Sequence, residues 1–558
     1  MDNQKLMLYV ALSFVLLMLW QAWQEDYGPK SGTPTTQVAE PLANGSGMAP
    51  PTTANSSAKA DTSADIPKLA TPNLPTLPPS PAQPMLKSAE RIHVVTDLYN
   101  IEIDALGGDL RQIELRAYPV TAENPDQPFR FLSDNPEQFF IAQGGLLGNA
   151  APNHYALYQI EQTNYRLADG ATELQVPLSW RDPSGVEVIK TYVFQRGSYL
   201  VQIKYQVRNA TNTEWRGQLY TQFQRTEPAN KKSAFGIYTY TGGIVSSPET
   251  TYDKVDFARM KKENLSQDFK NGWLAMIEHY FAAAWIPPRD LAIHAYTKVV
   301  DGDRYVLGYT QLPVTVSAGG NATLATQLYV GPKVQYRMKE AAPNLELTVD
   351  YGKLTVIAQP IYWLLEVIQH MVSNWGWSII LLTIIIKAAF FHLSATSYKS
   401  MAQMRKLSPR IQALKERYGD DRQKMNEAMM EIYRKEKINP LGGCLPIVVQ
   451  IPVFIALYWV LVESVELRQA PWMFWIHDLS AQDPYYVLPL IMGVTMFIQQ
   501  KLSPAPPDPI QAKVMMFMPI MFTGMFLFFP SGLVLYWIVN NTLSITQQWY
   551  ITNKLAKE

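Results

Sequence analysis

The chain has 558 residues, more than one ordinary domain holds, and its 48 basic and 48 acidic residues give no indication of nucleic-acid binding. The single cysteine, Cys444, excludes an intrachain disulfide and a metal site built on thiolates. The 7 histidines show no metal-ligand spacing such as HExxH, so the sequence predicts neither a metal nor another cofactor.

The N-terminus, residues 1–27, is a predicted transmembrane signal anchor with its first residues in the cytoplasm. Lys5 precedes an apolar run, and Trp20 and Trp23 follow it where interfacial aromatic residues are expected. A cleaved signal peptide is the alternative, but the small-x-small cleavage pattern is missing. Residues 28–88, rich in Pro, Ser and Thr, predict a disordered linker, because they cannot bury enough apolar area to offset the entropy of ordering.

Residues 89–350 show the pattern of a large antiparallel β-sandwich. Apolar and polar residues alternate in RIHVVTDLYNIEIDALGGDLRQIEL (91–115), around a Gly-Gly turn, and in YLVQIKYQVRNATNTEWRGQLYTQF (199–223), around a polar turn. Because this domain follows the first span, we expect it on the periplasmic side. It shows no catalytic constellation. Three of its aromatic residues either line a ligand groove or pack the sandwich: Tyr238, Tyr240 and Trp285.

An amphipathic helix is predicted over residues 351–374. Ile361, Leu365 and Ile368 recur at helical spacing, with polar residues such as Glu366 between them. The helix either lies along the membrane surface or packs against the sandwich.

Five further apolar segments follow. These segments are about 375–394, 445–462, 485–500, 514–529 and 533–549. Together with the anchor at 1–27 they predict a polytopic α-helical membrane protein of six transmembrane helices. The segment 396–440 between the first two holds eleven Lys/Arg against six Asp/Glu, whereas the next loop has only Arg468. By the positive-inside rule, both termini are cytoplasmic and the β domain is periplasmic.

A cytoplasmic helical hairpin is predicted over residues 396–438. YGDD (418–421) separates its two helices, and Asp421 is placed to cap the second. Methionines on both helices either seal the hairpin or offer adaptable contacts to apolar partners: Met401, Met404, Met425 and Met429.

Lys387 stands alone in the apolar stretch LLTIIIKAAFFHL (381–393), about 4 Å along the axis from the middle of its span. A lysine at a helix centre costs roughly 2.5–3.5 kcal/mol on insertion scales, less if it snorkels to a nearby boundary. Thr383 shares its helix face. Other spans carry polar residues that favour a wet cavity rather than a stray charge: Gln450, Gln499, Gln500, Asn540, Ser544 and Gln547.

The stretches 439–504, which begins NPLGGCLPIVVQIPVF, and FMPIMFTGMFLFFPSGLVLYWIVNN (517–541) resemble the YidC/Oxa/Alb family of membrane protein insertases. The resemblance implies a β-super-sandwich similar to sugar-binding enzymes but without their activity. It also implies a five-helix core over 375–558 with a hydrophilic groove open to the cytoplasm and lipid. Such a protein inserts and helps fold inner-membrane proteins, alone or with the Sec translocon. Its partners would be nascent membrane proteins, ribosomes and membrane lipids, with no hydrolytic activity and no nucleic-acid sequence recognition.

The resemblance also assigns site residues. Lys387 takes the place of a groove arginine, with Thr383 beside it, and we expect it to stay protonated because the groove is wet. His392 replaces a proline of close relatives, so a straighter helix end is expected there. The weakly basic tail argues against strong ribosome binding through it. The implied substrate contacts and groove-side positions are Gln450, Ile451, Phe454, Gln500, Phe522, Phe526 and Trp537.

Two rival functions are disfavoured by the sequence. A secondary transporter is expected to show a buried acid or an inverted repeat, and neither is evident in the spans. An intramembrane hydrolase would use His392 and Ser394, but residues two apart on a helix point in different directions.

Overall fold

The computed structural model describes residues 87–228, 239–301, 303–418, 421–436, 445–502 and 509–555. The predicted anchor at 1–27 and nearly all of the linker at 28–88 lie outside these residues, as does Tyr238. The described chain divides into two compact units. One is the helical hairpin within Gln403–Pro440, and the other contains the β domain and the remaining helices.

The β domain contains two sheets. The larger one has the order β13-β16-β17-β10-β5-β3-β2-β1-β6, with β4 beside β3 and β18 beside β10. Its strands are β1 (Arg91–Val95), β2 (Tyr99–Asp104), β3 (Asp109–Pro119), β4 (Pro128–Leu132), β5 (Phe140–Gly148), β6 (Asn164–Arg166), β10 (Trp215–Thr226), β13 (Ser266–Phe269), β16 (Ile293–Val300), β17 (Arg304–Gln311) and β18 (Val314–Val316).

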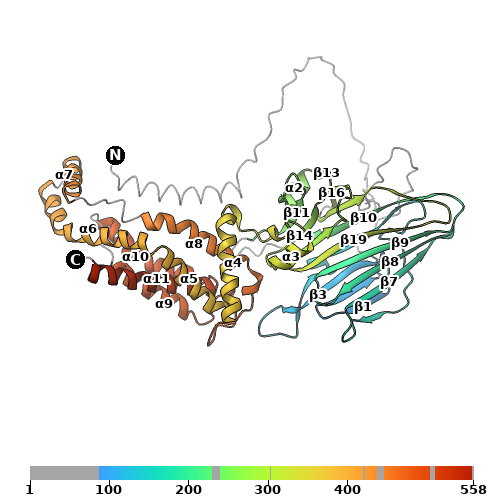
Figure 1. Cartoon of the computed structure of the whole chain (residues 1–558), viewed down its shortest axis with the longest axis horizontal. Helices are drawn as coiled ribbons and strands as arrows, with labels where there is room; N and C mark the ends of the chain where they lie inside the picture. The colour runs from blue at the N-terminus through green and yellow to red at the C-terminus, as the bar shows by residue number, and fades with distance from the viewer. Residues whose placement is uncertain are drawn as a thin grey trace, which may run out of the picture. The chain divides into compact units, whose positions relative to one another are not determined.

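The second sheet has the order β12-β11-β14-β15-β19-β9-β8-β7, and its long strands run side by side in Figure 1. Its strands are β7 (Glu173–Arg181), β8 (Val186–Gln195), β9 (Leu200–Asn209), β11 (Gly242–Ser246), β12 (Asp253–Val255), β14 (Trp273–Ile277), β15 (Phe281–Ile286) and β19 (Asn321–Pro332). Strand pairs are antiparallel, as predicted, but β1 and β6 pair in parallel. Two short helices, α2 (Phe257–Lys262) and α3 (Gln335–Ala341), complete the domain.

Burial follows the period of two that the sequence shows, and side chains of both sheets meet in one apolar core. The Tyr99 hydroxyl on β2 donates to the Val330 carbonyl on β19 at 2.6 Å and so ties the sheets together. Gly107, in the predicted turn between β2 and β3, has φ +80°, and a Cβ there would lie 2.5 Å from a backbone oxygen. Trp285 and Tyr240 pack on the core, which confirms the packing interpretation for these two aromatic residues.

The helical core is built around its last helix. The helix α11 packs against α5, α8 and α9, while α10 packs against α9, and α4 packs against α5 and α8 (Figure 1). Their bounds are α4 (Thr355–Val372), α5 (Trp375–Ala389), α8 (Leu445–Glu463), α9 (Val487–Leu502), α10 (Pro509–Phe526) and α11 (Ser531–Tyr550).

The first core span is bent, so the expectation of a straighter helix end at His392 is wrong. The helix α5 stops at Ala389, and a 66° bend separates it from α6 (Phe391–Tyr418) without any proline at the break. Beyond the bend, Tyr398 on α6 interacts with Ser544 on α11. Of the described helices, none taken singly is long and apolar enough to cross a membrane, although this bent pair is when taken together. The count of six spans therefore stays a prediction.

The predicted hairpin forms from α6 and α7 (Arg422–Lys435). Asp421 caps α7 as predicted, because its carboxylate accepts the Lys424 amide hydrogen at 3.1 Å. Arg410 and Glu436 form an ion pair across the hairpin at 2.7 Å. Met429 is buried in it and Met404 and Met425 are partly buried, which favours the sealing role for these methionines.

Candidate functional site

Lys387 is buried in the helical core and contacts α11. Only 6% of its surface is exposed, and its Nζ donates to Ser544 Oγ at 2.8 Å. Ser544 in turn donates to the Asn540 carbonyl at 2.8 Å, so its oxygen is oriented to accept from the lysine. Among the described residues no carboxylate pairs with Lys387. A positive charge is thus held by a neutral hydroxyl.

The local sequence explains how α5 presents this lysine. Asn374 caps the helix by accepting the Trp377 amide hydrogen at 3.1 Å, and an apolar run continues to Ile386. Thr383, one turn before Lys387 and predicted to share its helix face, is buried. Its hydroxyl donates to the Ile379 carbonyl at 2.6 Å, so its hydrogen bond is made to its own helix and not to the lysine.

A second polar contact joins α8 to α11. Gln450 Nε2 donates to Asn540 Oδ1 at 3.0 Å, one turn of α11 away from Ser544. The predicted polar residues Lys387, Gln450, Asn540 and Ser544 therefore lie together, and we call them the Lys387 cluster. Gln547, predicted on the same face, has its Oε1 buried without a hydrogen-bond partner among the described residues.

Two polar residues of α11 were missed by the sequence reasoning. Asn541 Nδ2 donates to Thr495 Oγ1 at 3.3 Å, and Gln548 Nε2 donates to the Leu502 carbonyl at 2.9 Å, both on α9. The doublets NN at 540–541 and QQ at 547–548 were the available signal, because adjacent residues on a helix face different neighbours. Gln500 lies in the same last turn of α9, two residues before Leu502.

Four of the predicted apolar contacts come together as an aromatic cluster. Phe454 lies 4.9 Å from Trp537, and Phe526 lies 5.7 Å from the same ring, measured between ring centroids. Phe522 is 6.4 Å from Phe526. Ile451, one turn before Phe454 on α8, is exposed. The predicted side chains of the third and fifth spans thus meet at α11.

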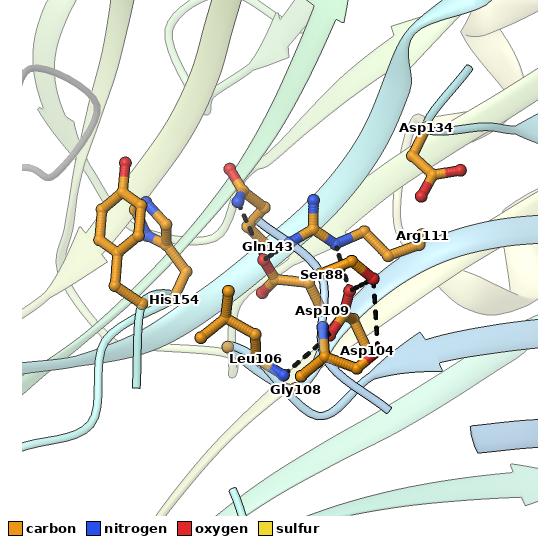
Figure 2. A network of polar contacts seen from close by, with 12 residues as sticks. Ser88, Asp104, Leu106, Gly108, Asp109, Arg111, Asp134, Gln143 and His154 are labelled. Carbon is orange, nitrogen blue, oxygen red and sulfur yellow. Dashed lines mark hydrogen bonds and ion pairs between the residues drawn. The ribbon is translucent and has the colours of Figure 1, made fainter. Parts of the chain in front are cut away.

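The β domain contains a separate buried polar network (Figure 2). Arg111 lies between two fully buried carboxylates, 3.8 Å from Asp104 and 3.7 Å from Asp109. Gln143 donates to Asp109 at 2.9 Å, and the buried Lys190 acts on Asp109 electrostatically. Arg91 also lies 3.4 Å from Asp104, so three basic side chains surround the two carboxylates. Arg111 Nε and Asp109 Oδ1 are buried without a hydrogen-bond partner among the described residues, but the opposite charges lie within ion-pair distance inside the core, so this network is best explained as structural.

Comparison with known proteins identifies the family. Residues 91–364 match the family model of the YidC periplasmic domain, and residues 367–558 match that of the 60Kd inner membrane protein. A protein named membrane protein insertase YidC, from Methylococcus capsulatus, is 51% identical over 561 residues, with 100% of this chain and 99% of the relative covered. The chain belongs to the YidC family.

A second YidC relative, from Alkalilimnicola ehrlichii, is 50% identical and covers 100% of this chain and 96% of its own length. A solved structure titled as an active YidC insertase with its first transmembrane domain resolved aligns with a TM-score of 0.40 at 17% identity. The alignment covers 83% of this chain and 93% of that one. The two family models divide the chain into a periplasmic β domain and an inner-membrane helical region, as the YidC family has them.

Proposed function

We propose that this chain inserts nascent proteins into the inner membrane and acts as a chaperone for their folding, alone or with the Sec translocon. The observation that supports this best is Lys387, a buried cation held by a serine hydroxyl with no carboxylate partner among the described residues. A structural lysine is expected to be paired when buried, because an unpaired buried charge is costly. A lysine that receives acidic or polar groups from a passing chain needs to be unpaired.

In this mechanism the Lys387 cluster lines a wet groove open to the cytoplasm and lipid. Lys387 exchanges Ser544 for a carboxylate or other acceptor near the incoming segment, which lowers the cost of bringing that group partway into the membrane. The apolar part of the segment slides along Ile451 and Phe454 on α8 and Phe522 on α10, which are exposed or half-buried. Release into lipid requires no hydrolysis.

The proposal includes the predicted topology. The anchor at 1–27 and five core spans cross the inner membrane, both termini are cytoplasmic, and the β domain at 89–350 lies in the periplasm behind the linker at 28–88. The hairpin at 396–438 then lies on the cytoplasmic side, where ribosomes deliver nascent chains. Membrane lipids surround the core, and the helix at 351–374 lies at the periplasmic surface.

Reconstitution into liposomes with a small two-span substrate tests the role of Lys387. We expect Lys387→Ala and Lys387→Glu to slow insertion strongly, and Lys387→Arg to retain it because the positive charge remains. Lys513→Ala is the matched control, since it removes an exposed lysine from α10 of the same core. Insertion at the wild-type rate by both Lys387→Ala and Lys387→Glu would refute the electrostatic role.

A further inference from the structure

A cavity of about 320 Å³ lies where the β domain meets α4. One wall comes from the β domain, through Tyr118, Tyr199 and the helix α3. The other comes from α4, from the start of α5 and from the turn η5 (Val465–Leu467) after α8. Its remaining charged and polar lining residues are Tyr336, Arg337, Glu366, Gln369, His370 and Glu466.

The charged groups in this cavity do not neutralise each other. Arg337 is held by β-domain groups, because its guanidinium donates to the Tyr336 hydroxyl and the Gly197 carbonyl at 3.0 Å each. It also lies over the Tyr199 ring, 5.1 Å from the centroid. Within the described chain, no carboxylate comes within ion-pair distance of Arg337. A cation on one wall and carboxylates on the other suit a ligand that carries both charges.

The carboxylates on the opposite wall are Glu366 and Glu466. Glu466 accepts a hydrogen bond from the Tyr362 hydroxyl at 2.8 Å, which fixes its position, and burial raises its pKa to about 7. Glu366 acts electrostatically on Glu466 and is half-buried. An ammonium group bound here would stabilise the charged form of Glu466, and Glu366 lies on the same wall of the cavity.

An exposed apolar stripe runs along α4 beside the cavity. It consists of Val356, Trp363, Val367 and Met371, of which Val356 and Met371 are more than 80% exposed. Spacings of seven, four and four residues place them on one helix face. Val367 and Met371 directly follow the cavity residues Glu366 and His370 in the sequence, so the stripe and the charged wall are neighbouring faces of one helix.

We propose that this cavity binds the headgroup of a phospholipid that carries a primary amine. Arg337 holds the phosphate, Glu366 and Glu466 hold the ammonium group, and the acyl chains lie along the apolar stripe of α4. The lipid would fix the β domain against the membrane surface. The cavity shares no residue with the Lys387 cluster. The inference goes beyond the proposed function and shares with it only the membrane location.

Native mass spectrometry of the full chain in detergent tests the inference without any insertion substrate. The protein is offered phosphatidylethanolamine, phosphatidylcholine and phosphatidylglycerol with identical acyl chains. Phosphatidylcholine is the decisive comparison, because its quaternary amine cannot donate hydrogen bonds. We expect the wild-type chain to prefer phosphatidylethanolamine over phosphatidylcholine by about tenfold, the effect of one hydrogen bond to a charged group.

The double variant Glu366→Gln/Glu466→Gln should lose this preference, and Arg337→Gln should weaken binding of all three lipids. Arg166→Gln, on the exposed strand β6, is the matched control and should behave like the wild type. Thermal unfolding identifies any variant that fails to fold. The comparison of phosphatidylethanolamine with phosphatidylcholine uses the wild-type chain and does not depend on the variants. Equal binding of the two lipids by the wild type, or a preference retained by the folded glutamine variant, would overturn the inference. Neither result bears on Lys387-dependent insertion.

Discussion

A buried ion pair between Lys333 and Glu463 should hold the β domain on the helical core. Lys333 follows the last strand, β19, and Glu463 is the last residue of α8. Their Nζ and Oε2 atoms are 3.1 Å apart, and the side chains are only 2% and 4% exposed. Lys333 also donates to the Thr348 carbonyl at 3.1 Å. Water can reach neither charged group unless the contact between the β domain and the helical core opens.

The magnitude follows from this burial. Removing one partner of a buried pair typically costs about 3–5 kcal/mol, because the other charge remains buried and unpaired. At about 3 °C per kcal/mol for a large domain, Lys333→Met should lower the unfolding midpoint by roughly 10 °C. Replacing both charges is often close to neutral, so Lys333→Met/Glu463→Gln should be markedly more stable than Lys333→Met alone.

Scanning fluorimetry of the four proteins in a double-mutant cycle measures this coupling. The more exposed pair of Lys254 on β12 and Asp350 at the end of the β domain, 2.5 Å apart, gives a comparison within the same protein. Lys254→Met should cost no more than about 1 kcal/mol, as surface ion pairs do. If the losses of the two single variants simply add in the double variant, or if Lys333→Met is as mild as Lys254→Met, the reasoning is wrong.

Three further predictions concern single side chains. Burial raises the pKa of Glu466 from 4.5 to about 7, so the folded state loses stability as pH rises through that range. Glu466→Gln should therefore raise the free energy of unfolding at pH 8 by up to about 3 kcal/mol, but hardly at pH 4. Ser544→Ala removes the acceptor of Lys387 and should cost about 1.5–3 kcal/mol of stability while insertion in liposomes continues, since the lysine is then free for substrate. Asp421→Ala removes the cap of α7 and should cost the hairpin about 1 kcal/mol, seen as faster hydrogen exchange of its first amides.

Each of these has a control within the chain. Equal effects of Glu466→Gln at pH 4 and pH 8 would contradict the burial argument. Ser544→Thr keeps the hydroxyl and should restore stability, and a Ser544→Ala protein as inactive as Lys387→Ala would make the serine itself essential. Asp421→Ser keeps a capping oxygen and should show the hydrogen exchange of the wild type. Unchanged exchange in Asp421→Ala would contradict the capping role.

Local features were predictable wherever neighbouring residues determine them. The period of two gave the strands of the β domain, Gly107 marked the turn before β3, and Asp421 marked the start of α7. The polar residues Gln450, Asn540 and Ser544 were likewise visible as exceptions in apolar helices. These signals are local because backbone conformation and burial at one face depend on residues a few positions apart.

Partners distant in sequence were not predictable. The strands β9 and β10 follow each other across a short turn, yet they belong to different sheets, because the sheet that a strand joins depends on partners distant in the sequence. The bend at Phe390 has no proline in the sequence that would predict it. Lys333 and Glu463 are 130 positions apart, and neither residue is unusual in its own segment.

Three lysines are buried among the described residues, and the cost of burying their charge is offset in different ways. Lys190 donates to the carbonyls of Gly107 and Gly144 at 3.0 and 2.9 Å, lies over tyrosine rings and feels Asp109 nearby. Lys333 has a carboxylate and a carbonyl. Lys387 has a serine hydroxyl, and no carboxylate in the described chain offsets its charge. Removing Lys190 or Lys333 would therefore leave unsatisfied groups and destabilise the fold, whereas removing Lys387 leaves only a hydroxyl that already bonds to its own helix. A lysine whose loss costs the fold so little, yet whose burial costs so much, is best explained by attraction for a group that arrives with the substrate.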